Sequence, residues 1–236
     1  MNVVITGASR GIGKAIAEVF AANGDRLFIT SLNEVNLYRA LEDLQTKYPG
    51  TDIKAKAFDL GIKDQAQAFG NWCLEQAVPD ILVNNAGLFQ PGSVYNEPDG
   101  ILESQIAVNM FSAYHLTRTL LPEMMKGTSV GKERHIFNIC STASLQAYKN
   151  GGAYSISKFA MYGFSKNLRE ELKPFHIKVT SVHPGAVSTD SWAGFDNSAN
   201  RIMEADDIAH LIFTASRLSP AACVEDIVVR PQLGGI

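Results

Sequence analysis

The glycine-rich turn near the start of the chain constrains the fold more than any other feature. A short apolar run, Asn2–Thr6, is typical of a buried strand, and the turn Gly7-Ala8-Ser9-Arg10-Gly11-Ile12-Gly13 follows it at once. The amphipathic stretch after the turn, about Lys14–Ala22, predicts a helix. A strand, a glycine turn and a helix in this order place backbone N–H groups and a helix N-terminus where a pyrophosphate can bind.

Each glycine of the turn has a physical reason. Gly7 permits the tight turn, Gly11 the close approach of a phosphate, and Gly13 the packing of helix on strand. A nucleotide-triphosphatase loop is excluded, because Ala8 stands in place of its first glycine and Ala15 in place of its magnesium-binding hydroxyl. The turn alone leaves open a glycine-rich connection that binds no ligand.

Strand-like and helix-like segments alternate along the whole chain without repeats or linkers. Such alternation implies right-handed crossovers and a parallel sheet covered on both faces. The sequence therefore predicts a single α/β domain, residues 1–236, with a doubly wound, Rossmann-type fold and a mostly parallel seven-stranded sheet. The expected strands are Asn2–Thr6, Arg26–Thr30, Ile53–Ala57, Ile81–Asn84, His135–Ile139, Lys178–Val182 and Asp226–Arg230, and the clearest further helices are Glu34–Tyr48, Ile62–Gln76, Asp99–Met125, Ala153–Lys173 and Asp206–Leu218.

Composition excludes several classes of protein. The net charge of -3 and the pI of about 6.0 offer no basic surface for nucleic acid. No apolar stretch approaches the ~18 residues of a membrane span, and the N-terminus lacks the features of a signal peptide. Cys73, Cys140 and Cys223 are scattered and odd in number, which argues against disulfides or zinc and favours a cytoplasmic location.

A serine, a tyrosine and a lysine in the second half of the chain form a candidate proton-handling site. Tyr154 and Lys158 are four residues apart, so on a helix they lie on one face. A free tyrosine has a pKa of ~10, and an adjacent ammonium is expected to lower it toward the operating pH. The hydroxyl of Ser141, which follows a predicted strand, could hold a substrate oxygen beside the phenol.

The polar and glycine motifs converge on one edge of the predicted sheet. Gly7, Asp59, Asn85, Ser141 and Pro184 each follow a different predicted strand. Ligands of such sheets bind beyond the carboxyl ends of the strands, at the switch point of strand order. The sequence therefore predicts one shared site.

These motifs together resemble the short-chain dehydrogenase/reductase family, in its compact single-domain branch, over essentially the whole chain. The resemblance rests on Thr6-Gly7-x-x-x-Gly11-x-Gly13, Asp59-Leu60, Asn84-Asn85-Ala86-Gly87, Asn109, Ser141, Tyr154-x-x-x-Lys158, and Pro184-Gly185 with Thr189. It implies an NAD(P)-dependent oxidoreductase that interconverts a carbonyl and an alcohol. The chain looks like small bacterial reductases related to sepiapterin reductases and 3-oxoacyl-carrier-protein reductases, which implies a small ketone, a pterin side chain or a 3-oxoacyl group as substrate.

The resemblance also assigns roles in catalysis. Tyr154 would donate the proton, Ser141 would polarise the substrate oxygen, and Lys158 would hold the nicotinamide ribose. Asn109 would open its helix locally and hold a water that connects to the lysine; the alternative is a satisfied core asparagine. A cofactor-binding regulator with the same fold would usually lack one of the three catalytic residues, and a hydrolase built on Ser141 would need a histidine base in a nucleophile elbow that the chain lacks.

The resemblance places the cofactor along the glycine turn and the strand ends. Asp59 would bind the adenine amino group, or else cap the following helix, and Asn85 to Gly87 would run along the adenosine, or else pack the sheet edge. The expected cofactor-binding residues are Gly7, Ser9, Arg10, Gly11, Ile12, Gly13, Ser31, Asn33, Asp59, Leu60, Asn85, Ala86, Gly87, Tyr154, Lys158, Pro184, Gly185, Val187 and Thr189.

The end of the second strand favours NADP(H) over NAD(H). The stretch from Thr30 to Asn33 has no carboxylate to repel a 2′-phosphate; Ser31 and Asn33 could donate hydrogen bonds and Arg10 a cation. Leu32 stands where many NADP-dependent relatives carry an arginine, and Arg10 could instead be a solvated loop charge. We expect a preference for NADPH, with NADH also used.

The remaining expectations concern the substrate and assembly. Trp192 and Phe195 lie in the segment 185–205, where the family places its substrate-covering loop, and are expected to contact substrate. The five histidines show no metal spacing and are expected to have no catalytic role, and no metal site is expected. In the family the helices expected over Asp99–Met125 and Ala153–Lys173 pair across subunits, so a homodimer or homotetramer is expected.

Overall fold

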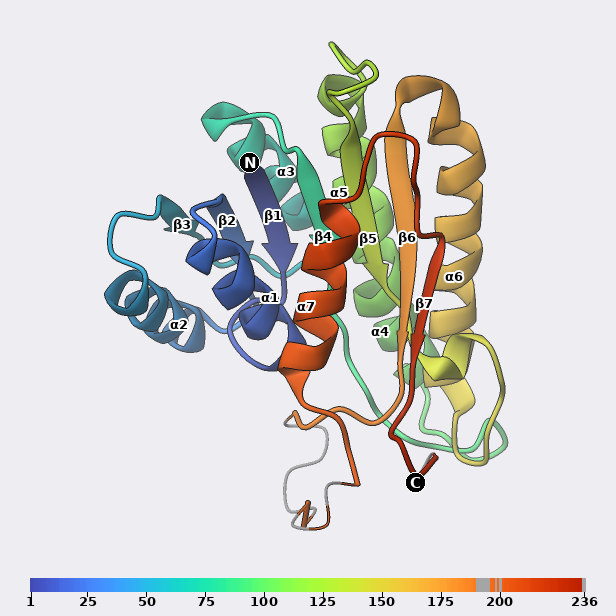
Figure 1. The fold of residues 1–236 in the computed structure, drawn as a ribbon. Helices are drawn as coiled ribbons and strands as arrows, with labels where there is room; N and C mark the ends of the chain where they lie inside the picture. Colours follow the sequence, from blue (N-terminus) through green and yellow to red (C-terminus); the bar gives the residue numbers. More distant parts are fainter. Residues whose placement is uncertain (190–195, 198, 200, 235–236) are drawn as a thin grey trace.

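The computed structural model describes residues 1–189, 196–197, 199 and 201–234. In these residues seven strands form one parallel sheet in the order β3-β2-β1-β4-β5-β6-β7, with helices on both faces (Figure 1). The predicted fold class is therefore confirmed. In chain order the elements are β1 (Asn2–Thr6), α1 (Gly11–Ala22), β2 (Arg26–Thr30), α2 (Glu34–Lys47), β3 (Ile53–Ala55), α3 (Lys63–Gln76), β4 (Ile81–Asn84), α4 (Ile101–Ile106), a π-helical segment (Ala107–Phe111), α5 (Ser112–Met124), β5 (Arg134–Ile139), a 3₁₀ turn (Thr142–Ser144), α6 (Gly152–Leu172), a second 3₁₀ turn (Lys173–Phe175), β6 (Ile177–Pro184), α7 (Ala205–Ser216) and β7 (Asp226–Val229).

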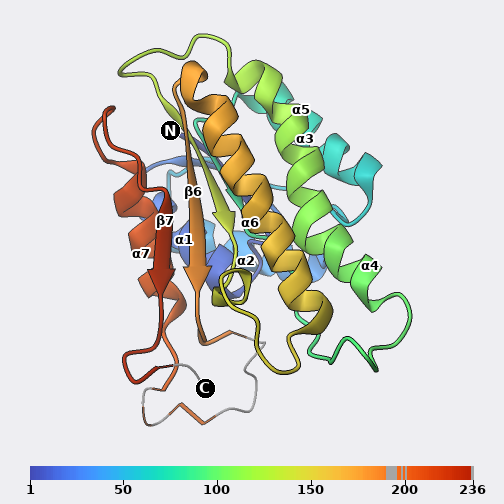
Figure 2. The same cartoon turned by 90° about the vertical axis from the view of Figure 1, so that its right-hand side faces the viewer.

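Alternation of side chains along the strands divides the core into two layers. On one face of β1, Val3 and Ile5 pack with α1, α2 and α7, whereas Val4, which points to the other face, packs with α3, α5 and α6. Figures 1 and 2 show these two sets of helices on opposite sides of the sheet. Strands buried on both faces explain why the sequence shows them as continuous apolar runs.

The strand order reverses between β1 and β4. After β1 the chain continues to β2 and β3 on one side of the sheet, whereas after β4 it continues to β5, β6 and β7 on the other side. A crevice therefore opens beyond their carboxyl ends, where α/β sheets bind ligands. The glycine turn and the segment after β4 both start at this point.

Several predicted boundaries differ from the structure, and three of the differences lie in elements that carry predicted site residues or lead to them. The helix expected over Asp99–Met125 is α4, a π-helical segment and α5 in succession, because the buried side chain of Asn109 bonds to neighbouring segments and widens the turn. Strand β6 runs to Pro184, so this residue ends the strand instead of following it, and β3 stops at Ala55. The proline is tolerated at the strand end because it needs no ladder hydrogen bond there.

No helix in the described part of the chain is long and apolar enough to cross a membrane. The three cysteines are free thiols. Within the same described ranges, no group of His, Cys, Asp or Glu side chains is arranged to hold a metal ion.

Candidate active site

The glycine turn joins β1 to an α1 N-terminus that no side chain caps. Gly7 and Gly11 have φ of 65° and 53°, the left-handed region that favours glycine. A Cβ on Gly13 would lie 2.3 Å from the Gly7 carbonyl oxygen, so only glycine fits there. Arg10 occupies the N-cap position in extended conformation and makes no side-chain cap hydrogen bond. The N-cap residue therefore offers no side-chain acceptor to the first N–H groups of α1, a position that suits an anionic group.

The segment after β4 holds this turn in place. Asn85 donates from Nδ2 to the carbonyl oxygens of Thr6 at 2.9 Å and Gly7 at 3.1 Å. In return the Thr6 hydroxyl oxygen accepts from the backbone N–H groups of Asn85 and Ala86, each at 2.9 Å. A Cβ on Gly7 would lie 3.0 Å from the Ala86 Cα. Asn85 and Ala86 thus have the sheet-edge packing role that the sequence left open; their contact with adenosine stays a prediction.

Two serines connect the glycine turn to the end of β2. The hydroxyls of Ser9 and Ser31 lie 2.9 Å apart. Asn33 caps α2 by accepting from the Asn36 N–H at 2.9 Å, a structural role in addition to the predicted one. Leu32 is 70% exposed and adds no charge to this corner. The predicted 2′-phosphate residues therefore gather around one corner of the site, together with Arg10 of the turn.

Asp59 and Leu60 differ in where they point. The Asp59 carboxylate accepts from the Gly61 N–H at 3.0 Å, and the Asp59 N–H donates to Oε1 of Gln65 at 2.8 Å. The N-cap residue of α3 is Ile62, so Asp59 closes a turn just before the helix instead of capping it. Leu60 is buried in the core layer under α3, which leaves its backbone as the part that a cofactor could touch.

Ser141, Tyr154 and Lys158 meet where β5 and α6 approach each other. Ser141 follows β5 and begins the 3₁₀ turn, where its hydroxyl oxygen accepts from the Ala143 N–H at 3.1 Å. Lys158 is buried, donates from Nζ to the Ile139 carbonyl at 2.9 Å, and lies 5.8 Å from the centre of the Tyr154 ring. Tyr154 is half-buried and lines the same cavity as Ser141. The three side chains thus form one cluster.

The pKa values of this cluster differ from expectation in one respect. Burial raises the pKa of Tyr154, and the Ser141 side chain only partly opposes this. The predicted net lowering of this pKa toward neutral pH is therefore wrong, because desolvation dominates. Burial also lowers the pKa of Lys158 from 10.5 to about 8, so the lysine is still mostly protonated at neutral pH.

Asn109 lies at the back of this cluster, in the π-helical segment. Its Oδ1 accepts from the Leu88 N–H at 2.6 Å, and its Nδ2 donates to the Leu88 carbonyl at 2.9 Å and to the Ser157 hydroxyl at 2.8 Å. The predicted local opening of the helix is therefore present, but the amide itself is a satisfied core group. A Cβ on Gly87 would lie 3.4 Å from Asn109 Oδ1 and 3.6 Å from Lys158 Nζ, so only a small residue keeps this region open. The water relay stays a prediction that would have to use the Asn109 backbone.

A cavity of about 580 Å³ extends from the start of α1 to the cluster of Ser141, Tyr154 and Lys158. Its walls come from the start of α1, the segment after β4, the end of β5, α6, and the stretch after β6. Nine predicted site residues line it: Ile12, Gly87, Ser141, Tyr154, Lys158, Pro184, Gly185, Val187 and Thr189. The other predicted residues that the structure describes do not line this cavity, and Trp192 and Phe195 lie outside the described residues.

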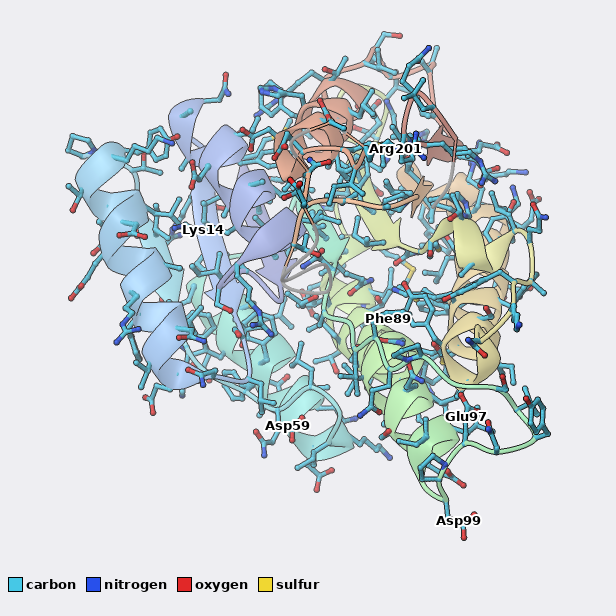
Figure 3. All side chains as sticks on the ribbon, turned by 90° about the horizontal axis from the view of Figure 1, so that it is seen from below. Lys14, Asp59, Phe89, Glu97, Asp99 and Arg201 are labelled. Carbon is cyan, nitrogen blue, oxygen red and sulfur yellow. The ribbon has the colours of Figure 1, made fainter. Side chains whose placement is uncertain are left out.

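Among the lining residues that the sequence prediction missed are Phe89, Gln146, Tyr148 and Arg230. The Phe89 ring meets the Tyr154 ring edge-on, with centres 4.8 Å apart, and Figure 3 shows Phe89 near the middle of the carboxyl edge of the sheet. Its position two residues after Gly87 was the signal that could have found it. Gln146 and Tyr148 lie in the stretch between Ser141 and Tyr154, whereas nothing in the sequence marks Arg230.

One histidine makes contacts that the sequence did not predict. His183, in β6, is fully buried, and its ring nitrogens lie 2.8 Å from the Ser144 hydroxyl and 3.3 Å from an Asp226 carboxylate oxygen. Ser144, His183 and Asp226 are far apart in the sequence, so no local pattern could predict this contact.

Comparison with known proteins agrees with this geometry. The family model described as short chain dehydrogenase matches residues 1–200. An uncharacterized oxidoreductase of Staphylococcus epidermidis is 29% identical over 231 residues, with 97% of this chain and 96% of that protein covered. A metagenomic short-chain oxidoreductase solved in complex with NADP is 30% identical, covers 98% of this chain and 97% of its own, and has a TM-score of 0.84.

A second solved structure extends the likeness. L-sorbose reductase from Gluconobacter frateurii, complexed with NADPH and L-sorbose, is 25% identical, with a TM-score of 0.86 over 97% of this chain and 94% of its own. The matched residues 1–200 contain the glycine turn, the segment after β4 and the Ser141, Tyr154 and Lys158 cluster. The chain therefore belongs to the short-chain dehydrogenase family, whose members are oxidoreductases that act on CH–OH groups.

Proposed function

We propose that the protein is an NADP(H)-dependent oxidoreductase that interconverts a carbonyl and an alcohol, with Tyr154 as the general acid and base. One observation carries the proposal: Ser141, Tyr154 and Lys158 line the same cavity as Ile12, at the uncapped N-terminus of α1. A proton-handling cluster and an anion-binding helix end thus share one space. A bound dinucleotide requires this arrangement, because its phosphates need an anion-binding site and its nicotinamide must lie beside the substrate.

A dinucleotide fits the residues that are present. Side chains at Gly7, Gly11 or Gly13 would collide with neighbouring residues or require strained backbone, so the turn leaves its N–H groups open at the surface. Gly87 in turn keeps the space beside Lys158 Nζ open. We propose that the turn and the start of α1 hold the phosphates, and that Lys158 and the stretch from Pro184 to Thr189 hold the nicotinamide half.

The chain's own residues handle the proton. The bound cofactor supplies the hydride for the carbonyl carbon. Tyr154 then gives its phenolic proton to the carbonyl oxygen, and Ser141 donates a hydrogen bond to the same oxygen. Lys158, cationic at neutral pH because its pKa is about 8, stabilises the phenolate that remains. In the reverse direction the phenolate accepts the proton from the alcohol.

We propose a preference for NADPH over NADH. The corner between the glycine turn and β2 has hydroxyls at Ser9 and Ser31, with Arg10 in the turn, and no carboxylate from Thr30 to Asn33. A 2′-phosphate finds donors there and meets no like charge. The titles of two related structures, the metagenomic oxidoreductase and L-sorbose reductase, name NADP and NADPH.

For the substrate we propose a small ketone, a pterin side chain or a 3-oxoacyl group. Phe89 and Tyr148 give the outer part of the cavity aromatic walls, which suit a compact, partly apolar molecule. The related L-sorbose reductase was solved with a small sugar ketone, which supports the first of the three classes. We further propose that the single domain, residues 1–236, covers its substrate with the segment 185–205, with Trp192 and Phe195 in contact.

We also propose that the protein is a homo-oligomer, a dimer or a tetramer, in the cytoplasm. Four large apolar side chains on α4, the π-helical segment and α6 are between 42% and 47% exposed: Leu102, Phe111, Ile156 and Phe159. Exposed apolar groups on adjoining helices favour burial against a second copy of the chain. Free thiols at all three cysteines are consistent with a reducing compartment.

The Tyr154→Phe variant tests the proposed function. It keeps the ring that packs on Phe89 but removes the proton donor, so kcat with NADPH and a panel of carbonyl compounds should fall by about 10²–10⁴-fold. The dissociation constant of NADPH should change little. A variant that turns over as fast as the wild type contradicts the Tyr154 mechanism. A wild-type protein that binds NADPH but reduces no carbonyl supports the alternative, a catalytically weak regulatory protein of the same fold.

A further inference from the structure

His183 connects the serine of the proposed site to the edge of the sheet. It lies in β6, is fully buried, and packs edge-on against the Tyr162 ring of α6 at 4.7 Å between centres. Its Nδ1 lies 2.8 Å from the Ser144 hydroxyl and 3.3 Å from the Ser141 carbonyl. Its Nε2 lies 3.3 Å from Oδ1 of Asp226 in β7, whose other oxygen bonds to Lys166 at 3.0 Å.

The carboxylate sets the direction of these hydrogen bonds. Asp226 can only accept, so Nε2 of His183 carries the proton and Nδ1 is left as an acceptor. The Ser144 hydroxyl has one proton, which both Nδ1 of His183 and the Ser141 carbonyl oxygen are placed to accept, and its oxygen accepts from the Ser141 N–H at 3.4 Å. Burial lowers the pKa of His183, which is consistent with this neutral imidazole. Ser144 therefore links the backbone N–H and carbonyl of Ser141 to His183 and, through His183, to Asp226.

Ser144, His183 and Asp226 together have the composition of a hydrolase triad, but not its access. Ser144 is 1% exposed and His183 is 0% exposed, so no substrate carbonyl can reach the Ser144 oxygen. The pair His183 and Asp226 also makes no contact with the Ser141 hydroxyl itself. What this chain of bonds does hold is the backbone of Ser141, at the first residue of the 3₁₀ turn.

The orientation of the Ser141 side chain depends on this backbone. Its hydroxyl oxygen accepts from the Ala143 N–H inside the same turn, and Ser144 closes the turn by facing both the N–H and the carbonyl of Ser141. Without the His183 ring, Ser144 keeps its contact with the Ser141 carbonyl, but the turn loses its attachment to β6 and β7. The hydroxyl that must meet the substrate oxygen would then be held less precisely.

We infer that His183, oriented by Asp226, is a positioning residue for Ser141 and acts through Ser144. The inference rests on the proposed function, since it assigns Ser141 to the substrate oxygen. It implies that loss of His183 lowers turnover without weakening cofactor binding, because the bonds of His183 reach the Ser141 turn and not the glycine turn.

The experiment compares His183→Leu, His183→Asn and Ser144→Ala with the wild type. Leucine fills the space but removes both nitrogens, whereas the asparagine amide can still accept from Ser144 near the former Nδ1. We expect His183→Leu and Ser144→Ala each to lower kcat about 10-fold, the factor for ~1.4 kcal/mol. His183→Asn should keep most of kcat. In all three variants the NADPH dissociation constant should stay within about 2-fold of the wild-type value. The double variant, His183→Leu with Ser144→Ala, should lose no more of kcat than either single variant, because both act through the same contact.

A second buried histidine serves as the control. His135 is 4% exposed but lies at the amino end of β5, where it bonds to Thr180 at 2.7 Å, far from the cavity. His135→Leu should lower the melting temperature without changing kcat of the folded protein. If Ser144→Ala and a folded His183→Leu turn over as fast as the wild type, or if their losses simply add, the inference is wrong. The Tyr154→Phe result is independent of this series, so a failure of the proposed function is recognised separately.

Discussion

Gly13→Ala tests whether the glycine turn is shaped by packing. The added Cβ would lie 2.3 Å from the Gly7 carbonyl oxygen and 2.5 Å from the Asn85 amide nitrogen, both closer than any relaxed contact. One of these atoms is backbone, and the Asn85 amide is tied by two hydrogen bonds, so neither moves cheaply. The methyl group must therefore push the start of α1 away from β1.

The magnitude follows from two opposing terms. Overpacking of this kind costs about 1–3 kcal/mol. Alanine offsets it by about 0.5–1 kcal/mol, because it favours the helix over glycine. Taking the upper end of the overpacking cost, we expect the free energy of unfolding to fall by ~2 kcal/mol. For a chain of this size this corresponds to a fall in melting temperature of about 4–8 °C.

The assay is thermal unfolding at fixed protein concentration, together with NADPH titration. The matched control is Gly163→Ala in α6, where a Cβ meets no heavy atom within 4 Å. This change should stabilise the protein by about 0.5–1 kcal/mol. NADPH should bind more weakly to Gly13→Ala only, since the shift of α1 moves the N–H groups proposed to hold the phosphates. A Gly13→Ala protein as stable as the wild type, with equal NADPH affinity, would refute the packing argument.

Three further predictions concern cofactor choice, assembly and pH. Arg10→Ala should raise KM for NADPH about 10-fold or more while leaving NADH nearly unchanged; wild type that binds NADH more tightly than NADPH would contradict the cofactor preference. Phe159→Glu, on the exposed apolar face of α6, should shift the mass measured by light scattering toward the monomer, whereas a wild type that is monomeric at micromolar concentration would rule out the homo-oligomer. Burial lowers the pKa of His135 from 6.5 to about 3, so the unfolded chain binds a proton first as the pH falls below about 6.5, and stability should drop by ~1.4 kcal/mol per pH unit. His135→Asn should remove this slope in urea unfolding between about pH 6 and pH 4, and an unchanged slope would show that another group causes it.

The sequence alone was sufficient for the features that depend on local pattern. Apolar runs and helical periodicity located all seven strands and most helices, with errors at their ends and at the π-helical segment inside the helix expected over Asp99–Met125. The glycine spacing placed the turn correctly, because a positive φ at Gly7 and Gly11 and close packing at Gly13 are requirements that glycine alone meets. The four-residue spacing of Tyr154 and Lys158 placed both side chains at one cavity, because helical periodicity is a short-range rule.

The tertiary structure decided what depends on burial and on contacts between distant segments. The direction of the Tyr154 pKa follows from desolvation inside the assembled cavity, which outweighs the opposing effect of the Ser141 side chain. The π-helical segment at Asn109 exists because Leu88 and Ser157, from separate segments, bond to its amide. His183, Ser144 and Asp226 meet only because β5, β6 and β7 are neighbours in the sheet. Periodicity reports which face a residue occupies, whereas strand order and packing determine which residues it meets there.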